Sequence, residues 1–164
     1  MNAIVVVDQN WAIGQDNGLL FSLPTDMKRF RTMTTGCTVI VGRMTLDSFP
    51  GGKPLPKRRN IVITRNPEFQ REGCEVVTSP EAAMELAKGD ETVWIIGGAS
   101  VYAAMLPQCE RAYVTKVNSK ASGANSFFPN LDKHPAWKLV STSETITEEN
   151  GISFCFAEYV NTQL

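Results

Sequence analysis

One carboxylate stands in a position suited to chemistry. Asp26 lies in the stretch LLFSLPTDMKRFR, residues 19–31, among apolar residues and shortly after Pro24. An acid just behind a proline is typical of the first turn of a helix, where it is favoured by the helix dipole. Burial among apolar side chains also raises the pKa of a carboxyl group, because the ionised form loses hydration. Asp26 is therefore either a first-turn acid or a group that holds a bound ligand.

The histidine and the cysteines do not suggest a second kind of catalytic or metal site. The single histidine, His134, lies in the Pro-flanked stretch DKHPAW, where we expect a surface position. The four cysteines, at positions 37, 74, 109 and 155, form no CxxC pair. We therefore expect free thiols and no metal site.

Three stretches have residues that suit phosphate groups. Gly42-Arg43 and Gly97-Gly98 each follow an apolar run and precede a helical pattern, and Thr64-Arg65 ends a third run. Backbone N–H groups at a strand-to-helix turn bind anions, and glycine allows a close backbone approach. Each stretch alone is also compatible with an ordinary turn, and neither GxGxxG nor the P-loop motif occurs. Together they indicate a dinucleotide, and the two arginines favour NADPH over NADH.

Strand-like and helix-like patterns alternate along the chain. The strand candidates are residues 3–7, 38–41, 60–64, 75–77, 93–96, 112–117, 137–145 and 152–160, and the helix candidates are 24–34, 44–48, 80–87 and 100–106. This alternation predicts an α/β fold with a central, mostly parallel sheet of eight strands and about four flanking helices. Asn150-Gly151 predicts a hairpin between the last two strands, which would form an antiparallel C-terminal edge. In such sheets ligands bind at the carboxyl ends of the strands.

Length and charge limit the partners. The 164 residues suit one domain over 1–164, and 16 basic residues nearly balance 17 acidic ones. We therefore expect no nucleic-acid partner. No apolar run reaches the length of a membrane helix, and the first residues lack the features of a signal peptide. A cytoplasmic monomer without a membrane partner is the expectation.

Several segments of the sequence, taken in chain order, resemble segments of the dihydrofolate reductase family. The stretch AIGQDNGLLFSLPTDMKRF is similar to its active-site loop and acid-bearing helix. VGRMTLDSF, PLPKRRNIVITR, IIGGASVYAAMLP, AYVTKV and GANSFFP resemble its later segments. The resemblance covers nearly the whole chain. It implies reduction of 7,8-dihydrofolate to 5,6,7,8-tetrahydrofolate by hydride from NADPH, with antifolates as inhibitors.

The resemblance also implies roles for individual residues. Asp26 would anchor the pterin and promote its protonation, and Thr115 would hydrogen-bond both the acid and the pterin. Leu19 would close over the nicotinamide, and Phe21 would complete the catalytic set. Arg58 would pair with the α-carboxylate of the substrate's glutamate. The other implied substrate contacts are Ile4, Val5, Met27, Phe30, Arg31, Leu55 and Ile96. The implied cofactor contacts are Val6, Ala12, Ile13, Gly14, Asn17, Gly18, Leu19, Gly42, Arg43, Met44, Thr45, Thr64, Arg65, Ile96, Gly97, Gly98, Ala99, Ser100, Val101 and Tyr102.

Three positions depart from the family's common pattern. Leu20-Phe21 stands where the family often has Pro-Trp, and phenylalanine has no N–H to hold a water molecule. Ala124 stands where an aspartate is frequent, so its side chain accepts no hydrogen bond from the active-site loop. A second contact to the glutamate portion of the substrate would come from Lys53 or Arg31.

Two other functions stay open at this point. The chain could be a related reductase that acts on another heterocycle, such as a ribitylaminopyrimidine. It could also be a non-catalytic nucleotide-binding module that keeps only the fold. Asp26 and Arg58 argue against the related reductase, which activity on that pyrimidine but not on dihydrofolate would identify. Tight binding of NADPH without any binding of folates or antifolates would identify the module. The family also implies a cis bond at Gly97-Gly98.

Overall fold

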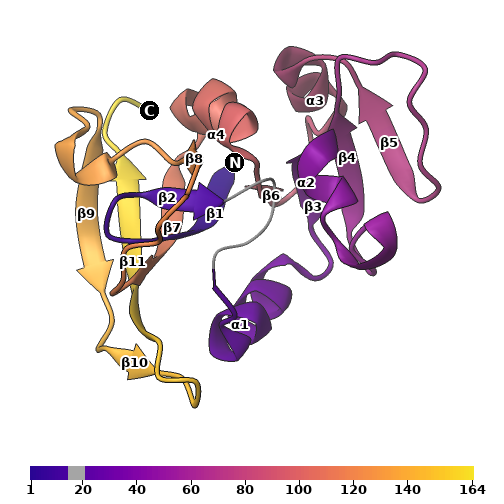
Figure 1. Cartoon of the computed structure of the whole chain (residues 1–164). Helices are drawn as coiled ribbons and strands as arrows, with labels where there is room; N and C mark the ends of the chain where they lie inside the picture. The colour runs from indigo at the N-terminus through magenta and orange to yellow at the C-terminus, as the bar shows by residue number, and fades with distance from the viewer. Residues whose placement is uncertain (15–20) are drawn as a thin grey trace.

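The β-branched runs of the sequence form one large sheet (Figure 1). The computed structural model describes residues 1–14 and 21–164. Strands follow the order β10-β11-β7-β1-β6-β3-β4-β5, and β9 also pairs with β11. Their bounds are β1 Asn2–Val7, β3 Thr38–Gly42, β4 Arg59–Ile63, β5 Cys74–Val77, β6 Val93–Ile95, β7 Arg111–Val117, β9 Trp137–Thr142, β10 Ile146–Thr147 and β11 Ser153–Asn161.

The predicted mixture of parallel and antiparallel pairing is confirmed. Strands β1, β3, β4, β5, β6 and β7 run parallel to their neighbours, whereas β11 runs antiparallel to β7, β9 and β10. The predicted strand 137–145 ends earlier, as β9 at Thr142, and β10 begins beyond the predicted bounds, at Ile146. Just after β9 the Ser143 hydroxyl accepts the N–H of Phe156 at 2.8 Å, so a side chain replaces a backbone partner there.

In the described part of the chain, four α-helices cover the sheet, close to their predicted bounds. They are α1 Pro24–Thr34, α2 Arg43–Asp47, α3 Pro80–Leu86 and α4 Ala99–Met105. Three short 3-10 turns are η1 Pro50–Gly52, η2 Leu106–Gln108 and η3 Leu131–Lys133. Helix α3 begins at Ser79, whose hydroxyl accepts the N–H of Ala82 at 3.0 Å and so caps the first turn.

Two short strands were not predicted. Strands β2 (Ala12–Gly14) and β8 (Ser126–Phe127) form a separate antiparallel pair. They are too short to show an alternating pattern. Aromatic packing beside them holds the pair in place: the rings of Trp11 and Phe128 stack at 6.2 Å, and the Phe128 N–H donates to the Trp11 carbonyl at 2.8 Å.

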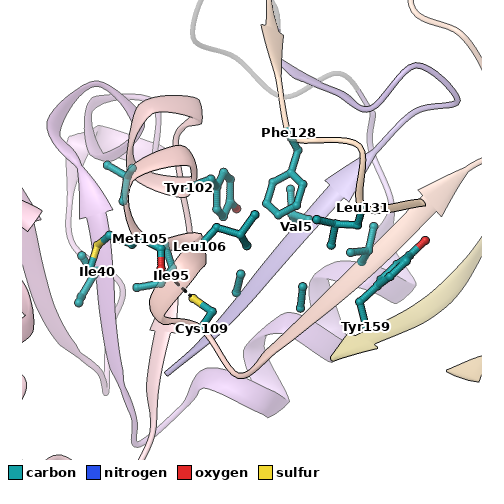
Figure 2. Close-up of a cluster of buried hydrophobic side chains, with 14 of the residues drawn as sticks. Val5, Ile40, Ile95, Tyr102, Met105, Leu106, Cys109, Phe128, Leu131 and Tyr159 are labelled. Carbon is teal, nitrogen blue, oxygen red and sulfur yellow. Dashed lines mark hydrogen bonds between the residues drawn. The ribbon is translucent and has the colours of Figure 1, made fainter. Parts of the chain in front are cut away.

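The central strands are buried on both faces. On one face, Ile40, Ile95 and Tyr159 pack with residues of α4 and with Phe128, and Figure 2 shows the Tyr102 and Phe128 rings side by side. Their centroids lie 4.9 Å apart in an edge-on arrangement. On the other face, Val39, Val41, Val62, Trp94 and Ile96 form a second cluster. Because parallel strands are covered on both sides, their functional side chains collect at the strand ends.

The predicted hairpin joins β10 to β11. The N–H of Glu148 donates to the carbonyl of Ile152 at 2.9 Å, and Gly151 adopts φ 89° in the turn. A positive φ of this size is easy only for glycine, which explains the Asn-Gly pair. Among the helices of the described residues, none has the length and apolarity needed to cross a bilayer.

Candidate active site

Asp26 is the third residue of α1 and does not cap that helix. The N-cap residue is Leu23, and no side chain of the N-cap position accepts a hydrogen bond there. The Asp26 carboxylate instead accepts the hydroxyl of Thr115 at 2.5 Å, across 89 residues of sequence. Thr115 lies on β7 and is almost fully buried. The carboxylate is thus fixed between a helix and the sheet, with acceptor capacity to spare.

Burial raises the pKa of Asp26 above its ordinary value. The Thr115 hydroxyl and the positive charge of Arg29 act in the opposite direction, and the negative charge of Glu148 adds to the rise. The carboxyl group therefore stays protonated to a higher pH than an exposed aspartate. A cationic or hydrogen-bonding ligand that meets this group restores the stabilisation that burial removes.

Apolar side chains line the sheet beside α1. Ile4, Phe30, Leu55 and Ile96 all belong to the cluster on this face. Met27, next to Asp26, is 53 % exposed. Val5 differs from its neighbour Ile4, because its side chain lies in the core of Figure 2, on the opposite face. The Val5 side chain therefore lies apart from that of Ile4, and the contact of Val5 with substrate stays a prediction.

Arg58 carries a charge without an acidic partner among the residues the structure describes. Its Nε donates to the carbonyl of Pro56 at 3.0 Å and its Nη1 donates to the Thr34 hydroxyl at 3.1 Å. Burial, together with the positive charge of Arg31, lowers the pKa of Arg58. The guanidinium lies 6.0 Å from the ring of Phe30. Neutral oxygens hold the guanidinium in place, and its charge remains available for an anion.

The three phosphate-suited stretches meet at one edge of the sheet. They follow β3, β4 and β6, which are neighbours in the order β6-β3-β4. The Gly42 N–H donates to the Gly97 carbonyl at 2.8 Å, and the Gly97-Gly98 peptide is cis, as the resemblance implied. A Cβ on Gly98 would lie 2.9 Å from the Thr45 hydroxyl. These glycines therefore leave space for the two backbone turns to touch.

The remaining cofactor residues lie around this edge in different settings. Thr64 is buried at the end of β4, and Arg65 beside it is exposed. The Arg43 guanidinium lies 4.0 Å from the Asp47 carboxylate and 5.8 Å from the Phe69 ring. Met44 is 54 % exposed, whereas Val101 and Tyr102 are buried in the core. The Tyr102 hydroxyl donates to the Ile4 carbonyl at 2.6 Å, which joins α4 to β1.

Other predicted residues lie in the cluster around Phe21, in β2, or outside the described part of the chain. Asn17, Gly18 and Leu19 fall outside the described residues. Phe21 packs with Leu23, Val117 and Phe154, and Val6 belongs to the same cluster. Ala12 and Gly14 form the ends of β2. In the described ranges, no group of three His, Cys, Asp or Glu side chains could hold a metal ion.

Three charged residues of this region were missed by the sequence reasoning. Asp8 is 2 % exposed, and its carboxylate accepts the backbone N–H groups of Asn10 at 2.8 Å, Ala12 at 2.9 Å and Ala121 at 2.8 Å. An aspartate after a strand, followed by polar residues, is a turn signal that could have found the local part. Arg29 and Glu148 affect Asp26 through space, and no local pattern marks them.

Comparison with known proteins agrees with this geometry. The family described as "Dihydrofolate reductase" matches residues 1–161. The chain is 38 % identical over 157 residues to the dihydrofolate reductase of Bacillus subtilis, covering 95 % of this chain and 91 % of that protein. It is 40 % identical over 127 residues to a type 3 dihydrofolate reductase of Salmonella typhimurium, covering 77 % of each.

A solved structure shows the same architecture. Dihydrofolate reductase from Enterococcus faecalis, complexed with NADP(H) and RAB-propyl, superposes with a TM-score of 0.88 at 33 % identity. The match covers 98 % of this chain and 95 % of that one. With the paired Asp26 and Thr115, the free charge of Arg58 and the glycine turns at one sheet edge, these matches show that the chain belongs to the dihydrofolate reductase family.

Proposed function

We propose that this chain reduces 7,8-dihydrofolate to 5,6,7,8-tetrahydrofolate with hydride from NADPH. The observation that carries the proposal is the half-buried Asp26 carboxylate, held by Thr115 and bordered by an apolar wall. Family membership and the neighbour bound to NADP(H) support the reaction and the cofactor. The same neighbour supports antifolate-like inhibitors as a second class of ligand.

Asp26 anchors the pterin in this proposal. Thr115 occupies one acceptor site of the carboxylate, and the remaining lone pairs accept the pterin's ring N–H and exocyclic amine. This pairing fixes the orientation of the ring and favours its protonated form electrostatically. The substrate's C=N bond accepts hydride at carbon more readily once its nitrogen is protonated. We assign the proton itself to water, since Asp26 contacts the other side of the ring.

Arg58 binds the distal end of the substrate. Its Nε and one Nη are already engaged by Pro56 and Thr34, so the guanidinium is oriented before the ligand arrives. The other donor of the fork faces the α-carboxylate of the glutamate. Arg31, in the last turn of α1, is close enough to influence Arg58 and supplies the second positive charge.

The glycine turns fit a dinucleotide. NADPH, when bound, supplies the hydride. The Gly42 and Gly97-Gly98 turns, which lie against each other without a Cβ between them, bring the starts of α2 and α4 close to its phosphates. Arg43 and Arg65 lie on the flanking corners and favour the additional phosphate of NADPH. Thr64, Met44, Thr45 and the start of α4 complete the cofactor surface.

We also propose that residues 1–164 act as one domain, as a monomer in the cytoplasm. One continuous sheet order supports a single domain. The four cysteines are free thiols, which suits a reducing compartment. Size-exclusion chromatography with light scattering measures the oligomeric state directly.

NADPH consumption with dihydrofolate, measured against pH, tests the proposal. We expect turnover in the wild type, and for Arg58→Gln we expect a KM for dihydrofolate raised roughly tenfold or more with kcat nearly unchanged. Lys57→Gln is the matched control, since it removes an adjacent exposed charge. No turnover at any pH would overturn the proposal. Activity confined to a ribitylaminopyrimidine would identify the related reductase instead, and binding of NADPH without folates would identify a non-catalytic module.

A further inference from the structure

Helix α1 begins without a cap from its own sequence. Its N-cap residue is Leu23, whose side chain has no acceptor, and Pro24 has no N–H to be satisfied. The first available donor is the N–H of Thr25. It donates to the Glu148 carboxylate at 2.8 Å, from a residue 123 positions later in the chain. A residue of the β10–β11 hairpin therefore supplies the missing cap.

A second bond joins the same two segments. The Asn150 side-chain amide donates to the Ser22 carbonyl at 3.1 Å. Glu148 and Asn150 thus hold the chain on both sides of Leu23 and Pro24, directly before Asp26. In Figure 1 the turn that joins β10 and β11 lies at the same end of the molecule as α1.

The Asp26 carboxylate lies between charges of opposite sign. Arg29 acts from its own helix, with its guanidinium 4.0 Å from the ring of Phe156, and Glu148 acts from the hairpin. The Thr115 hydroxyl on β7 donates to Asp26, and the Tyr102 phenol on α4 interacts with it electrostatically through space. Arg29 is partly compensated by Glu158 and Tyr113 on the sheet. Among the described residues, Glu148 is thus the negatively charged side chain outside α1 that raises the pKa of Asp26.

We propose that Glu148 is a positioning residue for Asp26: from the β10–β11 hairpin it closes the first turn of the active-site helix and places a negative charge beside the acid. This role rests on the proposed function, because it concerns the group that anchors the pterin. The hydrogen bond orients the turn that carries Asp26. The charge favours the protonated carboxyl group and, once Asp26 is ionised, adds to the field that favours a cationic pterin.

Two substitutions separate the hydrogen bond from the charge. Glu148→Gln keeps an oxygen that accepts the Thr25 N–H and removes the charge, whereas Glu148→Ala removes both. Glu149→Gln is the matched control, since it changes the net charge equally on the same turn and Glu149 has no partner among the described residues. The measurements are a ¹³C NMR titration of the Asp26 carboxyl group in the ligand-free protein and steady-state kinetics with dihydrofolate.

We expect both Glu148 variants to move the Asp26 titration to lower pH, and Glu149→Gln to leave it unchanged. We expect Glu148→Ala to lose roughly three- to tenfold in kcat/KM, as the loss of a helix cap predicts, and Glu148→Gln to lose much less. Titrations that coincide in all four proteins would overturn the role of the charge. Equal kcat/KM for Glu148→Ala and wild type would overturn the role of the cap.

The titration keeps this role separate from the proposed reaction. If the wild type does not reduce dihydrofolate, the proposed function fails, yet the Asp26 titration still reports whether Glu148 acts on the acid. If Glu148→Ala does not fold, Glu148→Gln carries the test of the charge. In that case the role of the cap is tested by comparing the thermal unfolding midpoints of Glu148→Gln and Glu149→Gln. We expect these midpoints to be equal.

Discussion

Asp26 and Asp8 are both shielded from solvent, but their carboxylates have different hydrogen-bond partners. The Asp8 carboxylate accepts three backbone N–H groups and is almost fully buried at the turn after β1. The Asp26 carboxylate accepts one hydroxyl and, among the described residues, no backbone N–H group. Burial without sufficient partners is costly for a charged group. The bonds of Asp8 therefore stabilise the fold, whereas the Asp26 carboxylate keeps acceptor sites for a ligand.

The difference shows how one side-chain type serves two purposes in the same domain. Backbone N–H groups are fixed once the strands pair, so a carboxylate that they saturate ties together segments of chain. Asp8 joins the turn before β2 to Ala121, far along the sequence. A carboxylate with unused lone pairs and a raised pKa retains the capacity to bind and polarise. The number of hydrogen-bond partners, together with the deeper burial of Asp8, separates the two roles.

Asp26→Asn gives the largest expected effect on activity. Asparagine keeps the shape and an acceptor for Thr115, but loses the charge that favours a protonated pterin. We expect kcat near neutral pH to fall roughly 100-fold or more, with NADPH affinity nearly unchanged. Stopped-flow hydride transfer and NADPH titration by fluorescence measure both. Wild-type turnover in this variant would contradict the role of Asp26.

Asp8→Ala gives the largest expected effect on stability. It leaves the buried N–H of Ala12 and the part-buried N–H groups of Asn10 and Ala121 without their acceptor, and we expect a loss of about 2 kcal/mol in the free energy of unfolding. Asp8→Asn is the milder control, because its oxygen can still serve Asn10 and Ala12. Urea unfolding measures the difference. An Asp8→Ala protein that is fully stable but inactive would erase the distinction between the two acids.

Thr115→Val gives an intermediate effect centred on Asp26. Valine fits a buried strand position and removes only the hydroxyl, which lowers the pKa of Asp26 in the wild type. We expect the pKa of Asp26 to rise further and kcat/KM for dihydrofolate to fall roughly tenfold. The pH dependence of kcat/KM is the measurement. A profile that matches wild type would mean that the hydroxyl does not control the acid.

The smallest expected effect is a pH dependence of stability. Because burial raises the folded-state pKa of Asp26, folding favours its protonated form, and that stabilisation is present at low pH. It is lost as the pH rises through the raised pKa. Asp26→Asn should therefore gain stability relative to wild type as the pH rises above about 4, the ordinary pKa of aspartate. Urea unfolding at several pH values checks this, and a constant difference would show that burial does not act on Asp26.

The sequence predicted features that local patterns encode. Helix α1 has its predicted bounds, because Pro24 sets its start. The turn at Gly151 also follows from its local residues. Gly42 and Gly97 meet because their strands are neighbours, which a parallel sheet made predictable. The prediction was weaker for β2 and β8, which are too short to carry a periodic pattern.

Features that join distant segments were beyond local reasoning. Glu148 reaches Thr25 across 123 residues, and Asp8 reaches Ala121 across 113. Neither contact follows from spacing, because the strand order of the folded sheet decides which turns lie together. The Thr115–Asp26 bond was expected only through the family resemblance. The placement of Val5 on the opposite face follows simply from the alternation along β1.

The position of β7 has a consequence for how the molecule assembles. This strand pairs with β1, the first strand of the chain, and with β11, the last. Thr115 on β7 is therefore fixed only when both ends of the chain have joined the sheet, and such long-range pairing is slow compared with helix formation. Affinity for an antifolate should consequently appear late in refolding, after most secondary structure has formed. Binding of the antifolate would then report that the sheet is completely assembled.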